Sequence, residues 1–224
     1  MEKKPKNNRI VVCIPGRQFS GNFLDCWTQL FGSLLKNGFQ VKLSREYTCT
    51  LPIVRHKCLG VSGFGPRRKT LFNGEYDYIL WIDSDQTFLP KHFEYLYADA
   101  EGGKEVVSGY YTYADLTGCA VGWIEGDDFK HVTRETGELM QRAKEENRLI
   151  VCDWVGMGFM LIKKGVFERI DYPYFAHPEQ LMQEGTFLDV LGEDLYFGKK
   201  LKDAGIPIHV DPRVRVGHEK MMIL

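Results

Sequence analysis

The sequence predicts an α/β protein with a mostly parallel central sheet and helices on both faces. Two observations support this fold class. Apolar runs at residues 9–14, 39–43 and 79–82 have the length and composition of strands buried on both faces, which belong to parallel sheets covered by helices. Segments with helical spacing lie between these runs, and the β-α-β-α-β order is that of a doubly wound sheet with right-handed crossovers.

Length, charge and cysteine usage narrow the class of protein. A chain of 224 residues fits one domain, and a formal net charge of -1 gives neither a basic field for nucleic acid nor a polybasic membrane anchor. The six cysteines include no Cys-x-x-Cys pair, which favours thiols of a reducing compartment over disulfides or a zinc site. No run has the length of a membrane span or the character of a signal peptide, so we expect a cytoplasmic protein.

Each helix of the first half has a start or stop signal. A helix from about Asn22 is expected to end at Gly38, a residue that favours helix C-termini. Thr50 can cap the N-terminus of a second helix. Pro52 fits the first turn of that helix, where backbone N–H groups have no partner within the helix. The first of these helices places its apolar residues on one face: Phe23, Trp27, Leu30, Phe31, Leu34 and Leu35.

The second half continues less regularly. The chain from 112 to 148 is loosely patterned and reads as a lid or substrate loop that ends in an exposed charged helix at 135–148. The remaining predicted elements are a helix from Pro90, strands at 106–110, 149–153 and 159–162, a turn at 154–158, a helix from Gly192 to Gly205, and a last strand region from 208 to 218.

The strand at 79–82 ends abruptly in Asp83, Ser84 and Asp85. Ligands of parallel sheets bind beyond the carboxyl ends of the strands. If the backbone stays extended through Ser84, the two carboxylates point the same way and can hold a cation or face a phosphate. Paired acids at a strand end are as often solvated turn residues, so the other polar segments decide between the two interpretations.

Three further segments can meet this edge of the sheet. They are the turn of Pro15, Gly16 and Arg17, the acids Glu193 and Asp194 at a helix start, and His218 near the end. Carboxylates with one imidazole suit Mn²⁺ better than Ca²⁺, with Mg²⁺ as an alternative. Such an ion would stabilise charge on a departing phosphate. The plain alternatives are a tight turn, acids that complement a helix dipole and a surface histidine.

These residues carry a resemblance to a known family. Ile82-Asp83-Ser84-Asp85 resembles the D-x-D signature of GT-A fold glycosyltransferases, and the segment 192–197 resembles their downstream E-D motif. The segment 211–218 resembles the stretch that ends in a metal-binding histidine, and 158–167 resembles the strand and turn before the E-D motif in family-2-like members. The match covers nearly the whole chain in the right order.

The resemblance implies a metal-dependent transferase that moves a sugar from a UDP- or GDP-sugar to a glycan or other hydroxyl acceptor. It implies a donor-binding half at about 1–110 and a smaller acceptor-side half at about 111–224. Asp83, Asp85 and His218 would bind Mn²⁺ or Mg²⁺. The donor would contact Pro15, Gly16, Arg17, Arg55, Asp83 and Ser84.

The E-D motif would supply the chemistry on the acceptor. In an inverting enzyme Asp194 would be the general base, and Glu193 would orient the acceptor. A carboxylate at a helix N-terminus has its charged form stabilised, which predicts a weak base. The segment Ser44-Arg45-Glu46 stands in place of the family's usual acidic-Gly-Ser turn, so the resemblance does not identify the nucleobase.

Three other functions compete. The run 83–87 also fits the D-x-D-x-T pattern of haloacid-dehalogenase-type phosphatases, with Asp83 as nucleophile, although that family places this residue after its first strand. A nucleotidyltransferase would need a Gly-rich, basic phosphate loop near the first strand, which the turn at 15–17 does not supply. A catalytically silent relative that binds nucleotide or glycan is the remaining alternative.

Overall fold

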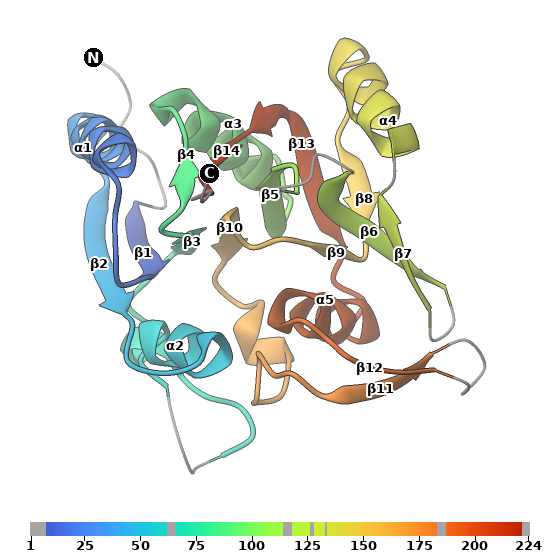
Figure 1. Cartoon of the computed structure of the whole chain (residues 1–224). Helices are drawn as coiled ribbons and strands as arrows, with labels where there is room; N and C mark the ends of the chain where they lie inside the picture. The colour runs from blue at the N-terminus through green and yellow to red at the C-terminus, as the bar shows by residue number, and fades with distance from the viewer. Residues whose placement is uncertain are drawn as a thin grey trace.

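A seven-stranded sheet forms the centre of the computed structural model, which describes residues 8–61, 66–113, 118–125, 128–132, 134–182 and 187–220. Its strand order is β2-β1-β3-β10-β5-β13-β8 (Figure 1). The strands are β1 (Arg9–Pro15), β2 (Gln40–Glu46), β3 (Tyr78–Ile82), β5 (Val106–Tyr110), β8 (Ile150–Cys152), β10 (Phe159–Lys163) and β13 (Ile208–Arg215).

Five of these strands run in the same direction. β1 pairs in parallel with β2 and β3, and β5 pairs in parallel with β13. β10 is antiparallel to both β3 and β5, and β8 is antiparallel to β13. The prediction of a mostly parallel sheet is therefore confirmed, with β10 and β8 as the two reversed strands.

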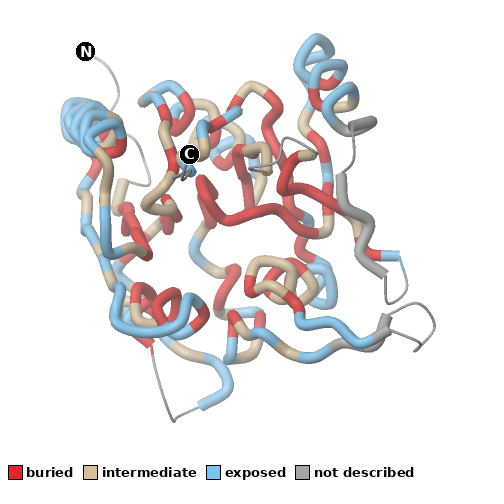
Figure 2. Tube along the Cα trace, viewed as in Figure 1, coloured by how far each residue is buried: buried red, intermediate tan, exposed pale blue. Residues whose placement is uncertain are grey.

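Helices cover both faces of the sheet. The helices are α1 (Gly21–Lys36), α2 (Leu51–Cys58), α3 (Pro90–Glu101), α4 (Arg134–Glu145) and α5 (Glu193–Asp203), with 3-10 turns at Leu71–Gly74 and Phe167–Arg169. Alternate residues of β1 and β3 point to opposite sides: Val11 and Trp81 join a core cluster with α2 and α5, whereas Val12 and Leu80 join one with α1 and α3. Figure 2 shows the buried strands between the helices.

Helix α1 begins and ends as its sequence predicts. Ser20 accepts a hydrogen bond from the backbone N–H of Phe23, and Gly38 has a φ of 81° just past the C-terminus. The predicted apolar face is only partly correct, because Phe31 and Leu35 are 37% and 51% exposed. A narrower stripe around Leu30 makes the contact with the sheet.

Several short strands were not predicted as separate elements, although the one at 217–218 lies within the strand region expected at 208–218. They are β4 (Gln86–Thr87) with β14 (Gly217–His218), β6 (Cys119–Glu125) with β7 (Asp128–Val132) and β9 (Trp154–Val155), and β11 (Glu179–Met182) with β12 (Phe187–Val190). β9 stands where a turn was expected, because Trp154 and Val155 pair with β6. The charged helix expected at 135–148 is present as α4.

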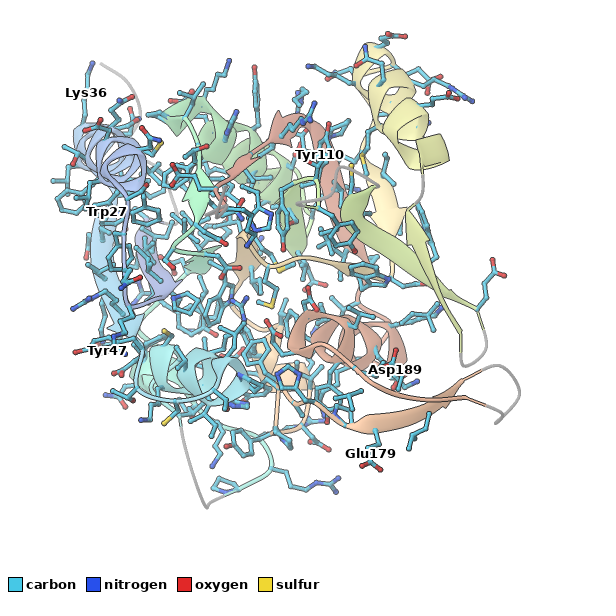
Figure 3. All side chains as sticks on the ribbon, viewed as in Figure 1. Trp27, Lys36, Tyr47, Tyr110, Glu179 and Asp189 are labelled. Atoms are coloured by element: carbon cyan, nitrogen blue, oxygen red, sulfur yellow. The ribbon has the colours of Figure 1, made fainter. Side chains whose placement is uncertain are left out.

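Side chains fill the space between the sheet and its helices (Figure 3). The outlying β11–β12 hairpin carries the labelled residues Glu179 and Asp189. None of the helices in the described part of the chain combines the length and apolar character needed to cross a membrane.

Helix α5 packs directly on β9 through Gly198. A Cβ atom at this position would lie 2.5 Å from the carbonyl oxygen of Asp153 and 2.7 Å from the Cβ of Trp154. Both are closer than atoms tolerate, so only glycine allows this approach. The helix begins with Glu193 and Asp194, and Gly198 therefore sets how near these acids come to the sheet.

Gly198→Ala is expected to lower the free energy of unfolding by about 1–3 kcal/mol, because the added methyl pushes α5 off β9. Urea denaturation measures the change. The matched control is Gly137→Ala in helix α4, where a Cβ meets no atom within 4 Å. That change should stabilise the protein by about 0.5–1 kcal/mol through helix propensity. Equal changes in the free energy of unfolding for Gly198→Ala and Gly137→Ala would contradict the close packing of α5 on β9.

Candidate functional site

The acid pair lies where the sequence predicts, at the carboxyl end of the third strand. The Asp83 backbone N–H donates to the carbonyl oxygen of Gly158 at 3.1 Å, and Gln86 N–H donates to the carbonyl of Asp83 at 3.1 Å. The chain therefore turns directly after β3 and enters β4 at Gln86. This turn places Asp83 and Asp85 at one end of the sheet, beside the antiparallel strand β10.

Arg55 joins the acid pair to helix α5. It is 1% exposed, and its Nη2 donates to Asp83 Oδ2 at 3.2 Å and lies 3.1 Å from Oδ1. Its Nε donates to Glu193 Oε1 at 3.3 Å, and its guanidinium carbon lies 5.3 Å from the centre of the Trp81 ring. Asp83, 28 residues after Arg55, and Glu193, 138 residues after it, thus meet at one buried cation.

The environment of this ion pair shifts the pKa values of Arg55 and Asp83. Burial lowers the pKa of Arg55, but the carboxylates of Asp83 and Glu193 outweigh burial and raise it. For Asp83 burial is the largest effect and raises the pKa, while Arg55 opposes it. Arg55 Nη1 and Asp83 Oδ1 are buried without a hydrogen-bond partner in the described residues. A donor and an acceptor of this kind can bind a ligand or a water.

Asp194 is not the weak base that its place at a helix start predicts. Burial, followed by repulsion from Glu193, raises its pKa from 3.8 to about 6. A backbone hydrogen bond from Leu195 and the charge of Arg55 act in the opposite direction. Burial therefore outweighs the Leu195 hydrogen bond and the charge of Arg55, and a pKa of about 6 lies close to neutral pH, where a general base is most effective.

His218 meets the acid pair from the far end of the chain. Strand β14 pairs with β4, with His218 opposite Gln86, and His218 Nε2 lies 3.1 Å from Asp85 Oδ2. The imidazole also packs on the ring of Tyr111, with centroids 4.6 Å apart. The structure thus brings Asp85 and His218 into contact, and their shared role in a site stays a prediction.

The expected three-ligand metal set is only partly assembled. Among the residues that the structure describes, no group of three or more His, Cys, Asp or Glu side chains is arranged to hold a metal ion. Asp83 is directed to Arg55, whereas Asp85 and His218 face each other. Metal binding by Asp83, Asp85 and His218 thus stays a prediction.

The donors of Asp85 and His218 fit a divalent cation. His218 Nδ1 lies 3.3 Å from the carbonyl oxygen of Thr112. In the tautomer that donates Nδ1–H to this carbonyl, the Nε2 lone pair faces the Asp85 carboxylate. In the other tautomer, Nε2–H donates to Asp85 at 3.1 Å. Carboxylate oxygen and imidazole nitrogen are both ligands that Mn²⁺ accepts.

The turn after β1 forms one wall of a cleft next to the acid pair. A Cβ at Gly16 would lie 2.3 Å from the Cβ of Ser84, so this turn approaches the Ser84 side chain as only glycine permits. The cleft has a volume of about 910 Å³. It is lined by Arg17, Gln18, Phe19, Ser20, Ser84, Asp85, Glu219 and Lys220. Pro15, the last residue of β1, is buried and does not line it.

Three residues of the site were not singled out from the sequence. Lys220 Nζ lies 2.6 Å from Asp85 Oδ2, and Glu219 accepts hydrogen bonds from Ser20 and Asn22 at the start of α1. Tyr111 packs against His218 because Gly156 has no side chain, since a Cβ there would lie 2.1 Å from the Tyr111 hydroxyl. The signal for Glu219 and Lys220 was their position directly after His218.

Comparisons with known proteins agree with this geometry at the level of the fold. No family model matches the chain, and no curated protein matches it. The crystal structure of A197 from STIV is similar with a TM-score of 0.57 and 19% identity, covering 96% of each chain. The fold is GT-A-like.

A second solved structure, GalNAc-T7 with UDP, GalNAc and Mn²⁺, is similar with a TM-score of 0.53 and 14% identity. The match covers 96% of this chain and 44% of the GalNAc-T7 chain, so the chain described here spans less than half the length of that protein. At these identities the likeness concerns the fold, and the chemistry depends on the residues of the site.

Arg55→Ala is expected to lower the free energy of unfolding by about 3–5 kcal/mol, because it leaves two carboxylates buried without their counter-charge. Urea denaturation at neutral pH measures the loss. Arg9→Ala is the matched control: Arg9 pairs with Asp77 at 2.8 Å, but its side chain is 42% exposed. An exposed pair contributes less than about 1 kcal/mol. Equal losses would contradict the central role of Arg55.

Asp194→Asn is expected to raise the melting temperature at about pH 8 and to leave it unchanged near pH 3.5. The folded pKa of about 6 lies above the ordinary value of 3.8, so folding favours the protonated form. The charged form therefore reduces stability above about pH 6, and this penalty disappears below the ordinary value. The amide removes the penalty.

Melting curves of the wild type and Asp194→Asn between about pH 3.5 and pH 8 test the direction of the pKa shift. Asp189→Asn on the exposed β12 strand is the control, and it should give no pH-dependent gain. A melting temperature of Asp194→Asn that is lower than that of the wild type at about pH 8, with the difference vanishing as the pH falls, would show that the environment lowers, and does not raise, the pKa of Asp194.

Proposed function

We propose that this chain transfers a sugar from a nucleoside-diphosphate sugar to an acceptor hydroxyl, with the help of Mn²⁺ or Mg²⁺. The observation that carries the proposal is the meeting of Asp85 with His218, 133 residues later in the chain, at the sheet edge that also holds Asp83. The likeness to GalNAc-T7, whose structure contains UDP, GalNAc and Mn²⁺, supports the choice of substrate class.

The donor would bind in the cleft between the turn after β1 and the acid pair. Arg17 and Ser84 line that cleft, and Gly16 lets the turn after β1 pack directly against Ser84. Arg55 would act through its unpartnered Nη1 on the donor side while it holds Asp83 in place. Pro15 contributes by shaping the turn. We assign donor binding to residues 1–110 and acceptor binding to residues 111–224.

A cation on Asp83, Asp85 and His218 would neutralise negative charge on the departing diphosphate. Asp194 would accept the proton of the acceptor hydroxyl, and its pKa of about 6 leaves it ionised at neutral pH yet basic enough for the transfer. Glu193, held by Arg55, would orient the acceptor. A base at this position corresponds to transfer with inversion of configuration.

The pairing of Asp83 weighs against the phosphatase alternative. A carboxylate nucleophile must reach phosphorus, whereas the Asp83 carboxylate is engaged by a buried guanidinium. Asp83 also follows β3, with β1, α1, β2 and α2 before it in the chain. Lys220 and His218, which both contact Asp85, would have no role in that reaction.

A thermal-shift screen with nucleoside diphosphates and nucleotide sugars, with and without Mn²⁺, is the first experiment. We expect a diphosphate to raise the melting temperature more in the presence of Mn²⁺, because bound ligand stabilises the folded state. Release of nucleoside diphosphate from the stabilising donor then measures turnover. Binding without turnover toward any hydroxyl acceptor would identify a silent binding protein. Hydrolysis of a generic phosphomonoester without donor cleavage would identify a phosphatase.

Asp194→Asn is expected to lower turnover by about 100-fold or more while donor binding is retained, because the amide cannot accept a proton. Asp85→Ala and His218→Ala should instead weaken the metal-dependent part of donor binding as well as turnover. Asp203→Asn, on the exposed last turn of the same helix α5, is the control and should keep both. Unchanged turnover in Asp194→Asn would remove this residue from the mechanism.

A further inference from the structure

Lys220 occupies a specific place on the acid pair. Its Nζ lies 2.6 Å from Asp85 Oδ2, the same oxygen that lies 3.1 Å from His218 Nε2. One carboxylate oxygen therefore faces two nitrogen groups, from residues that are two positions apart in the chain. Because the oxygen and the imidazole are the donors that a divalent cation would use, the ammonium stands beside both proposed ligands of the metal.

The residues just before Lys220, at 217–219, are held by several hydrogen bonds. Gly217 and His218 pair with β4, and the Glu219 backbone N–H donates to the carbonyl of Asp85 at 2.8 Å. The Glu219 carboxylate accepts hydrogen bonds from Ser20 at 2.5 Å and Asn22 at 2.7 Å. The backbone that carries His218 is thus fixed independently of the Lys220 side chain.

The Lys220 side chain itself has the freedom to move. It is 44% exposed, and the Asp85 side chain that it contacts is 38% exposed. An ion pair of this exposure is worth about 0–1 kcal/mol, far less than the buried pairs of Arg55. Lysine is a compact point charge on a flexible stem, so it can leave one oxygen for another without disturbing the fold.

We infer that Lys220 and a divalent cation exchange on Asp85, so that the ammonium holds the carboxylate in the metal-free protein and is released when metal binds. The carboxylate keeps a counter-charge in both states, which preserves the geometry of Asp85 toward His218. The released ammonium stays on the wall of the cleft, where it lines the donor site together with Arg17. The inference rests on the metal use in the proposed function.

Calorimetric titration with Mn²⁺, in the absence of nucleotide, tests the exchange. Lys220→Gln should bind Mn²⁺ about two- to fivefold more tightly than the wild type, because the metal no longer displaces an ion pair of up to about 1 kcal/mol. Arg17→Gln is the matched control: it removes a positive charge from the same cleft, but Arg17 makes no ion pair within the described residues. It should change the affinity less than Lys220→Gln does.

A second measurement uses the wild-type protein and does not depend on a variant. Acetylation of individual lysines, followed by peptide mass spectrometry, reports how accessible each ammonium is. Saturating Mg²⁺ should increase the labelling rate of Lys220 severalfold and leave that of Lys36, at the far end of α1 from Ser20, unchanged.

The outcomes separate this inference from the proposed function. Equal Mn²⁺ affinity in wild type and Lys220→Gln, or unchanged Lys220 labelling despite measured metal binding, overturns the exchange and leaves the metal-dependent transferase intact. Absence of Mn²⁺ binding in both proteins, even with a nucleoside diphosphate present, overturns the exchange together with the metal part of the proposed function.

Discussion

The buried ion pairs of Arg55 are the interaction on which the candidate site depends. A guanidinium with 1% exposure is costly to bury, and two carboxylates from distant segments compensate its charge. Because Asp83 follows the central strand and Glu193 begins α5, the pairs fix the distance between the acid pair and the helix that carries Asp194. Trp81 supplies the apolar ring beneath the guanidinium. The ion pairs that hold Asp83 and Glu193 in place thus also require that Arg55 be removed from water.

Burial also raises the pKa of Asp194. A helix N-terminus alone would keep a carboxylate ionised and weakly basic, and the neighbouring Arg55 acts in that direction too. Burial beside Glu193 outweighs both and raises the pKa to about 6. One turn further along the same helix, Gly198 lets α5 contact β9, because a side chain there would meet Asp153 and Trp154.

Much of this arrangement could be predicted from the sequence, and the exceptions have physical reasons. Buried parallel strands such as β1 and β3 are continuous apolar runs, and Gly38 and Thr50 mark helix ends, so the sheet and its helices were predictable. The strands β4, β9 and β14 are two residues long, and their pairing depends on partners that are remote in sequence. Local patterns contain no information about such pairing.

The candidate site, too, was predictable in part. The position of Asp83, Asp85 and His218 at one edge followed from the order of the elements and the family resemblance. That Arg55 turns to Asp83 and Glu193, and that Lys220 contacts Asp85, depended on side-chain directions that no spacing rule reports. The raised pKa of Asp194 was missed because helix position is visible in a sequence, whereas the depth of burial is a property of the assembled fold.

The charge balance of the site supports the use of a divalent cation. Asp83, Asp85, Glu193 and Asp194 bring four carboxylates together, and the basic side chains that pair with them are Arg55 and Lys220. With every carboxylate ionised, two negative charges are left without a paired cation, and a diphosphate donor would add more. One divalent ion supplies two positive charges, and it can bind where Lys220 now contacts Asp85. If a diphosphate donor binds here as proposed, a cation is required between it and the acids, because carboxylates and phosphate oxygens otherwise repel each other.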